Sequence, residues 1–178
     1  MHGLILAGLR DYSTVRLGEA RAAELWSDRV FDPTEAYDDA WFHAQFERLV
    51  DATGDSADDV ERDFGAFVAQ NSFTALFPHY YEESADTLAF LVGIEERIHE
   101  LVRATIRGAS PPKLHVQPLG GTGVLVSYTS ERGLCKLLEG LVHGTAQHYG
   151  DTIEVEEIQC MRRGDPGCVF SVVRSADA

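Results

Sequence analysis

The centre of the chain reads SADTLAFLVGIEERIHELVRATIRGASPPKLHVQPLGGTGVLVSYTSER from residue 84 to residue 132. Its first part, Ser84 to Ile106, carries apolar residues at helical spacing and ends before a glycine and a Pro-Pro pair, which are typical helix stops. Two short runs rich in β-branched residues follow, Lys113 to Gln117 and Val124 to Thr129, joined by a glycine-rich linker. The stretch therefore predicts one long helix and then a β-hairpin.

The C-terminal side continues with one more helix and two more strands. Helical spacing returns from Leu134 to Tyr149, and strand-like runs cover Thr152 to Cys160 and Cys168 to Val173. A Gly-Asp-Pro-Gly sequence separates the last two runs and favours a turn. These elements extend the hairpin into a small antiparallel sheet.

The N-terminal third is helical in pattern, with breaks at Gly18 and at Pro33, where a helix cannot continue. Asp38 to Ala52 is a helix with an apolar stripe, and another helix begins after Ser56. The aromatic segment Phe73 to Tyr81 is expected to be a partly irregular connection. This region therefore consists of short helices.

The predicted fold class is α+β in one domain of 178 residues, with a helical N-terminal lobe over about residues 1–60. The second lobe, over about residues 61–178, combines a small antiparallel sheet with helices. The 15 Lys and Arg against 29 Asp and Glu give a net charge of −14, which excludes nucleic acid and anionic membranes as good partners. No apolar run approaches the roughly 20 residues of a membrane helix.

His99 is the first candidate functional residue. On a helical wheel it lies in the middle of the apolar stripe formed by Leu88, Val92, Val102 and Ile106. A histidine there is either a core residue that is hydrogen-bonded to a neighbour, or an imidazole offered to a metal or haem iron in an apolar pocket. The paired acids nearby, such as those at residues 95 and 96, are typical of solvated helix faces.

Tyr128, Ser130 and Arg132 form the second candidate group. The two-residue period of a strand puts them on one face, where a phenol, a hydroxyl and a guanidinium converge. Such donors suit an anion with several oxygens, for example a pair of carboxylates. The alternative is an ordinary solvated strand face.

Together these residues resemble the H-NOX family of haem-nitric oxide/oxygen-binding domains. The resemblance covers the opening Met1 to Ile5, the Ile98-His99 pair and the Tyr-x-Ser-x-Arg pattern at residues 128–132. It implies a b-type haem between the two lobes, with His99 as the proximal iron ligand. Tyr128, Ser130 and Arg132 would hold the haem propionates, and Pro112 would press on the porphyrin.

The resemblance also identifies the side on which gas would bind. Ile5, Leu9, Leu137 and Leu141 match family positions that face the bound gas, and all four are apolar. Family members that hold O₂ stably have a tyrosine at the position of Leu137. The resemblance therefore implies a sensor that binds NO and CO and discriminates against O₂.

The cysteines form a third group. Cys135, Cys160 and Cys168 with one further ligand would make a tetrahedral zinc site, and some H-NOX proteins have zinc in this region. Glu157 and His143 are the candidates for the fourth ligand. Free thiols or a disulfide between Cys160 and Cys168 are the alternatives. Three cysteines without a signal peptide favour the reducing cytoplasm.

The function implied by the resemblance is a stand-alone gas-sensing module that is not itself an enzyme. Its output would pass to a separate protein such as a histidine kinase or a cyclic-di-GMP enzyme. One rival is a haem-free module, because Cys160 to Phe170 also resembles vinyl-reductase-type domains that bind small hydrophobic ligands. A second rival is a haem enzyme such as a peroxidase, which would need an acid/base pair that the four apolar gas-side positions argue against. A cysteine-based redox or zinc sensor is a further alternative.

Overall fold

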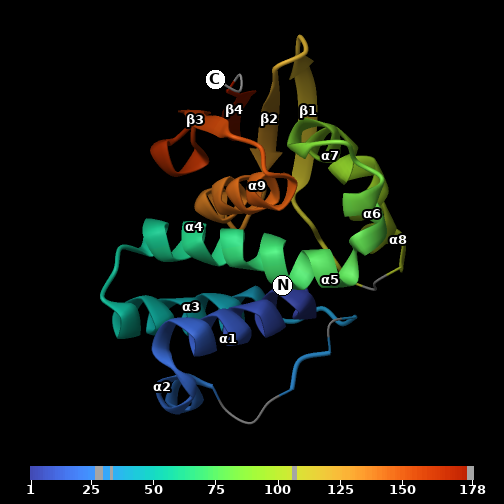
Figure 1. Ribbon diagram of the computed structural model, residues 1–178. Helices are drawn as coiled ribbons and strands as arrows, with labels where there is room; N and C mark the ends of the chain where they lie inside the picture. The colour runs from blue at the N-terminus through green and yellow to red at the C-terminus, as the bar shows by residue number, and fades with distance from the viewer. Residues whose placement is uncertain (27–29, 33, 106–107, 176–178) are drawn as a thin grey trace.

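The computed structural model describes residues 1–26, 30–32, 34–105 and 108–175 (Figure 1). The fold is α+β, as predicted, with helices in the N-terminal half and a sheet in the C-terminal half. The helices are α1 (Gly3–Leu17), α2 (Glu19–Leu25), α3 (Asp39–Thr53), α4 (Ala57–Val68), α5 (Thr74–Leu76), α6 (Pro78–Glu82), α7 (Thr87–Ile94), α8 (Glu100–Thr105) and α9 (Cys135–Tyr149). Two π-helical segments, η1 (Ala69–Phe73) and η2 (Glu95–His99), and a 3₁₀ turn, η3 (Met161–Arg163), complete the helical elements of the described residues.

The strands of the described residues form one antiparallel sheet in the order β1–β2–β4–β3. They are β1 (Lys113–Leu119), β2 (Gly123–Thr129), β3 (Ile153–Gln159) and β4 (Cys168–Arg174). The predicted hairpin is therefore confirmed as β1–β2. The two later strands, β3 and β4, pair with each other, and β4 also pairs with β2 of the hairpin. No helix of the described residues has the length and apolar character needed to cross a bilayer.

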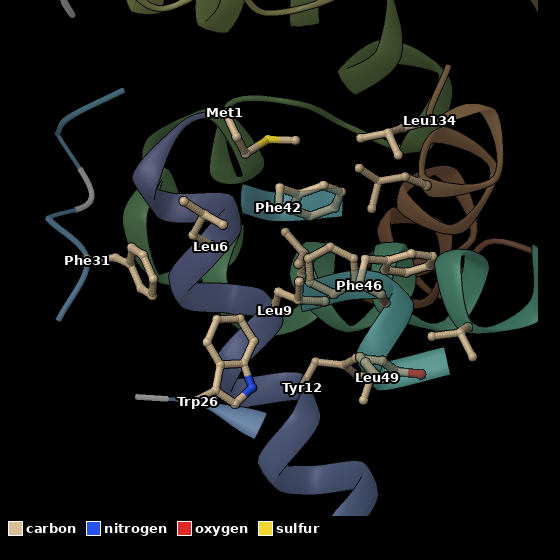
Figure 2. Close-up of a cluster of buried hydrophobic side chains, with 14 residues drawn as sticks. Met1, Leu6, Leu9, Tyr12, Trp26, Phe31, Phe42, Phe46, Leu49 and Leu134 are labelled. Carbon is tan, nitrogen blue, oxygen red and sulfur yellow. The ribbon is translucent and has the colours of Figure 1, made fainter. Parts of the chain in front are cut away.

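Two hydrophobic cores lie on either side of the middle layer formed by α4 and α9 (Figure 1). Figure 2 shows the first core, where Leu6 and Leu9 of α1 meet Phe42 and Phe46 of α3. The second core lies against the sheet and includes Val126, Val142 and Phe170. The described residues therefore form two cores with α4 and α9 between them.

Local signals set the helix ends that the sequence predicts. Asp38 accepts a hydrogen bond from the Ala40 N–H at 2.9 Å at the start of α3, and Gly54 ends that helix with a left-handed φ of 76°. Ser56 caps α4 by accepting from the Asp59 N–H at 3.1 Å. Gly18 separates α1 from α2 as predicted, whereas Pro33 lies outside the described residues.

Two predictions about helices need correction. The segment Phe73 to Tyr81 is largely helical, in α5 and α6, because Pro78 can occupy the first turn of a new helix. The single helix predicted for Ser84 to Ile106 is divided into α7, η2 and α8, and Ile106 lies outside the described residues. A π turn holds more residues than an α turn, so one wheel cannot describe both sides of η2. Val92 is 46% exposed instead of buried, although it lies in α7 with the buried Leu88, on the same side of η2.

Glycines bring α4 and α9 into backbone contact. A Cβ added at Gly140 would lie 1.9 Å from the Arg62 carbonyl oxygen, and one at Gly65 would lie 2.3 Å from the Leu137 carbonyl oxygen. Only hydrogen atoms fit at these positions. The contact fixes α9, and with it Leu137 and Leu141, against the N-terminal lobe.

Candidate functional site

A cavity lies between the N-terminus of α1, the segment from α7 to α8, and α9. Its wall is mostly apolar, which is typical of small-molecule sites. The polar side chains on the wall are His2, Tyr81, His99, Ser110, Tyr128, Ser130, Arg132 and Thr145. The cavity therefore combines an apolar body with a small set of donors.

His99 lines this cavity at the end of η2. Its Nδ1 lies 2.9 Å from Glu95 Oε2, and its side chain is 14% exposed. Burial lowers the pKa of His99 and outweighs the opposing effect of Glu95, so the ring is neutral near pH 7. Because a carboxylate only accepts, the proton is on Nδ1 and Nε2 keeps its lone pair for a metal. His99 is therefore hydrogen-bonded to its neighbour Glu95 and also lines the cavity.

Glu95 was assigned to a solvated helix face, and that prediction was wrong. Its Oε2 also accepts from the Leu114 N–H at 3.1 Å, and its other oxygen pairs with Arg103. Burial alone would raise the pKa of Glu95, but these bonds and the one with His99 hold it below its usual range. The spacing of four residues between Glu95 and His99 was the signal available in the sequence.

Tyr128, Ser130 and Arg132 all line the cavity, although not by the predicted strand geometry. β2 ends at Thr129, so only Tyr128 is on the strand, and the other two lie in the turn that follows. Tyr128 is buried, which raises its pKa to about 12 and excludes the solvated-face alternative for this residue. The turn after β2 brings the three donors to one cavity, although Ser130 and Arg132 are not on the strand and so do not follow its two-residue period.

Arg132 is held at the edge of the cavity by several partners. Its Nη1 donates to the Ser110 carbonyl oxygen at 2.5 Å, and its Nε lies 2.9 Å from Asp39 Oδ2. Asp39 also pairs with the amino group of Met1. The guanidinium is therefore fixed by α3, by the N-terminus and by the loop before β1.

The remaining predicted pocket residues fall into two groups. Pro112, Ile5, Leu137 and Leu141 line the cavity. Leu9 does not, because it lies further along α1 and is fully buried in the first core.

Comparisons with known proteins agree with this geometry. The profile of the haem-NO-binding family matches residues 3–157. The chain belongs to this family. A search of the curated proteins finds none that matches.

Several solved structures have the fold of this haem-NO-binding domain. An H-NOX protein from S. oneidensis in the Fe(II)NO state has a TM-score of 0.91 at 25% identity, over 99% of this chain and 100% of that one. The Shewanella oneidensis SO2144 H-NOX domain in the Fe(II)CO state has a TM-score of 0.89 at 25% identity, with the same coverage. An oxygen-binding H-NOX domain related to soluble guanylate cyclases has a TM-score of 0.86 at 24% identity, over 99% and 96% of the two chains. Since an NO complex and an oxygen complex share the fold, the fold does not determine which gas is bound.

The side chains on the cavity wall of this haem-NO-binding domain fit a haem. His99 offers an imidazole nitrogen, and Tyr128, Ser130 and Arg132 offer donors suited to propionates. Most of the rest of the wall is apolar, as a porphyrin requires.

His2 is a cavity residue that the sequence reasoning missed. Its Nδ1 accepts from the Leu4 N–H at 3.2 Å, so the neutral ring carries its proton on Nε2. Nε2 is buried and has no hydrogen-bond partner among the described residues. The domain therefore has a potential donor on its cavity wall, and the position of His2 as the helix cap was the available signal. Two further polar residues of the N-terminal half, His43 and Asn71, do not line the cavity and therefore add no donor to its wall.

The three cysteines of the domain meet beside the sheet. Cys135 Sγ lies 2.9 Å from Cys168 Sγ and 3.9 Å from Cys160 Sγ, and burial raises the pKa of the Cys135 thiol. Glu157 joins this cysteine cluster, with all four ligand atoms within 4.8 Å of one another, whereas His143 is not part of the group. Glu157 Oε1 is buried with no hydrogen-bond partner among the described residues. Three sulfurs and one carboxylate oxygen fit a tetrahedral zinc ion.

Proposed function

We propose that this domain is a gas sensor that binds NO and CO at a ferrous b-type haem and discriminates against O₂. The observation that carries the proposal is His99, which lines an apolar cavity with Nδ1 engaged by Glu95 and Nε2 left as a ligand. The haem would supply the iron that binds the gas. The protein's part is sensing, with no catalytic step of its own.

The chain's own residues have separable roles in this proposal. His99 would hold the iron, and Arg132, Tyr128 and Ser130 would orient the carboxylates at the edge of the cavity. Pro112, which also lines the cavity, would press on the macrocycle. Ile5, Leu137 and Leu141 keep the opposite side apolar.

An absorption spectrum of the purified protein tests the proposal directly. We expect a Soret band in the wild type and its loss in His99→Ala, with recovery when imidazole is supplied. His115→Ala is the matched control, because His115 is an exposed histidine on β1 and should leave the spectrum unchanged. An unchanged spectrum in His99→Ala would contradict the role of this residue, and no Soret band in the wild type would favour the haem-free vinyl-reductase-type alternative.

Gas selectivity is the finer part of the proposal. The residue at 137 is a leucine, and the nearby Thr145 hydroxyl already donates to the Leu141 carbonyl oxygen at 2.8 Å. We therefore expect the ferrous protein to bind NO and CO without a lasting oxygen complex, and Leu137→Tyr to gain one. Stable oxygen binding in the wild type that disappears in His2→Leu would show instead that the His2 N–H acts as the donor.

We also propose that the cysteine cluster holds one structural zinc ion per chain. The unpartnered Glu157 oxygen beside three buried thiols supports this assignment. Metal analysis under reducing conditions should find one zinc per chain, lost in Cys160→Ser and weakened in Glu157→Gln but not in His143→Gln. Three titratable thiols without zinc would favour the cysteine-based redox alternative.

Finally, we propose that the domain passes its signal by contact to a separate protein, such as a histidine kinase or a cyclic-di-GMP enzyme. The net charge of −14 favours a partner with a basic docking surface. Binding to a candidate partner should weaken as the salt concentration rises, and the partner's activity should differ with and without NO. A partner whose activity ignores NO would contradict the assignment.

A further inference from the structure

Glu95 joins three elements of the chain at one carboxylate. Oε2 accepts from His99 Nδ1 at 2.9 Å and from the Leu114 N–H at 3.1 Å, and Oε1 pairs with Arg103. These partners lie on η2, β1 and α8. A change in the position of His99 therefore acts on the Glu95 carboxylate, which is hydrogen-bonded to β1, the edge strand of the sheet.

The strand that Glu95 contacts leads directly to the donors at the cavity edge. Leu114 is paired with Tyr128 in the register of β1 and β2, and it follows Pro112 by two residues. β1 is the edge strand on this side, so the Leu114 N–H that faces η2 has no strand partner there. Glu95 satisfies that N–H and connects it to the imidazole.

We propose that Glu95 is the positioning residue of the iron site, which fixes the orientation of His99 and couples the imidazole to β1. The inference rests on the proposed haem-binding function. A carboxylate that accepts the Nδ1–H of a ligating histidine fixes the ring and makes Nε2 a stronger donor to the metal. Loss of such a partner typically costs about 10–100-fold in affinity for the bound metal group.

The neighbouring acids provide a contrast within the same turn. Glu96 and Glu100 are both exposed, and neither has a hydrogen bond to His99 among the described contacts. Glu96→Gln removes the same charge one residue away and is the matched control. A difference between Glu95→Gln and Glu96→Gln therefore reports the bonds of Glu95 and not the net charge of the helix.

The first test measures the iron–histidine bond of the ferrous, gas-free protein by resonance Raman. Glu95→Ala should lower the iron–histidine stretching frequency and raise the rate of haem transfer to apomyoglobin roughly 10–100-fold. Glu95→Gln should lower the frequency less, since an amide oxygen accepts more weakly than a carboxylate. Glu96→Gln should match the wild type. An unchanged frequency in Glu95→Ala would overturn the inference.

A second test does not depend on haem. Hydrogen exchange at the Leu114 amide should be faster in Glu95→Ala than in Glu96→Gln, in protein without haem. Equal exchange rates would overturn the link to β1. If the wild type binds no haem, the proposed function fails, but this measurement still decides whether Glu95 ties η2 to the sheet.

Discussion

The two helical walls of the cavity differ in how firmly they are held. α9 is a continuous helix in direct backbone contact with α4, and eight of its residues are buried. On the opposite wall, η2 and α8 together contain no fully buried residue, and a π turn interrupts the helix. The proposed iron ligand His99 is on the second wall, whereas Leu137 and Leu141 are on the first. The first wall is therefore held by more buried contacts than the second, and a difference of this kind is what a two-state sensor can use.

The largest contrast between the walls should come from glycine substitutions. In Gly140→Ala the new methyl group meets the backbone oxygen of Arg62, which cannot turn away. In Gly93→Ala on α7 it meets the end of the flexible Arg97 side chain. We expect Gly140→Ala to lower the free energy of unfolding by roughly 1–3 kcal/mol or more, and Gly93→Ala to change it by less than about 1 kcal/mol.

Urea unfolding followed by circular dichroism measures both variants against the wild type. Similar losses in the two variants would mean that the walls are equally rigid. A stable Gly140→Ala would show that α4 and α9 can separate without cost.

The second prediction concerns the donors at the edge of the cavity, between strand β2 and α9 in the chain. Arg132→Ala should raise the haem dissociation rate more than Ser130→Ala or Tyr128→Phe, because a charge-assisted hydrogen bond is roughly twice as strong as a neutral one. Thr129→Ala is the control, since Thr129 is exposed and is not on the cavity wall. Full haem retention in the triple variant would contradict the role of these residues.

The sequence predicted the fold well where signals are local. The helix that starts near Asp38, the helix that begins after Ser56 and the β1–β2 hairpin were all correctly placed, because each depends on neighbours within a few residues. The division of the long helix was missed, since hydrophobic periodicity assumes a constant helical pitch and nothing in that pattern marks a π turn.

The sequence predicted which residues form the candidate site better than it predicted how they are arranged in space. His99, Arg132 and the cysteines were named from the sequence, but Glu95 and His2 were not. The spacing of Glu95 and His99 and the position of His2 before α1 are local signals, but the contact of Glu95 with strand β1 and the exposure of His2 to the cavity are long-range and leave no local pattern. Asp39, which holds Arg132, was missed for the same reason.

The third prediction tests the anchor of α7, the helix that leads into η2. Asp151, just after α9, accepts hydrogen bonds from the N–H and the hydroxyl of Thr87 at 2.9 and 2.6 Å at the start of α7. Asp151→Asn should lower the free energy of unfolding by about 1 kcal/mol at pH 7. Glu154→Gln on an exposed part of β3 is the control.

The pH dependence of Asp151→Asn has a definite sign. Burial would raise the pKa of Asp151, but the Thr87 bonds and Arg174 outweigh it and hold the pKa below its usual range. The stabilisation is therefore present above the unfolded pKa of about 4 and disappears as the pH falls through the folded pKa. The difference between wild type and variant should shrink below about pH 4, and a constant difference would contradict the role of the charge.

The last and smallest expected effect concerns the response to gas. If NO weakens the bond between the iron and His99, residues 95–105 lose one of the few contacts that order them, while α9 keeps its contact with α4. Hydrogen exchange should then become faster along residues 95–105 after addition of NO and stay the same along α9. Pro112→Ala removes a cavity side chain that is proposed to press on the macrocycle, so without gas it should produce part of the same change. Equal changes in both walls, or none in residues 95–105, would mean that the signal leaves the cavity by another route.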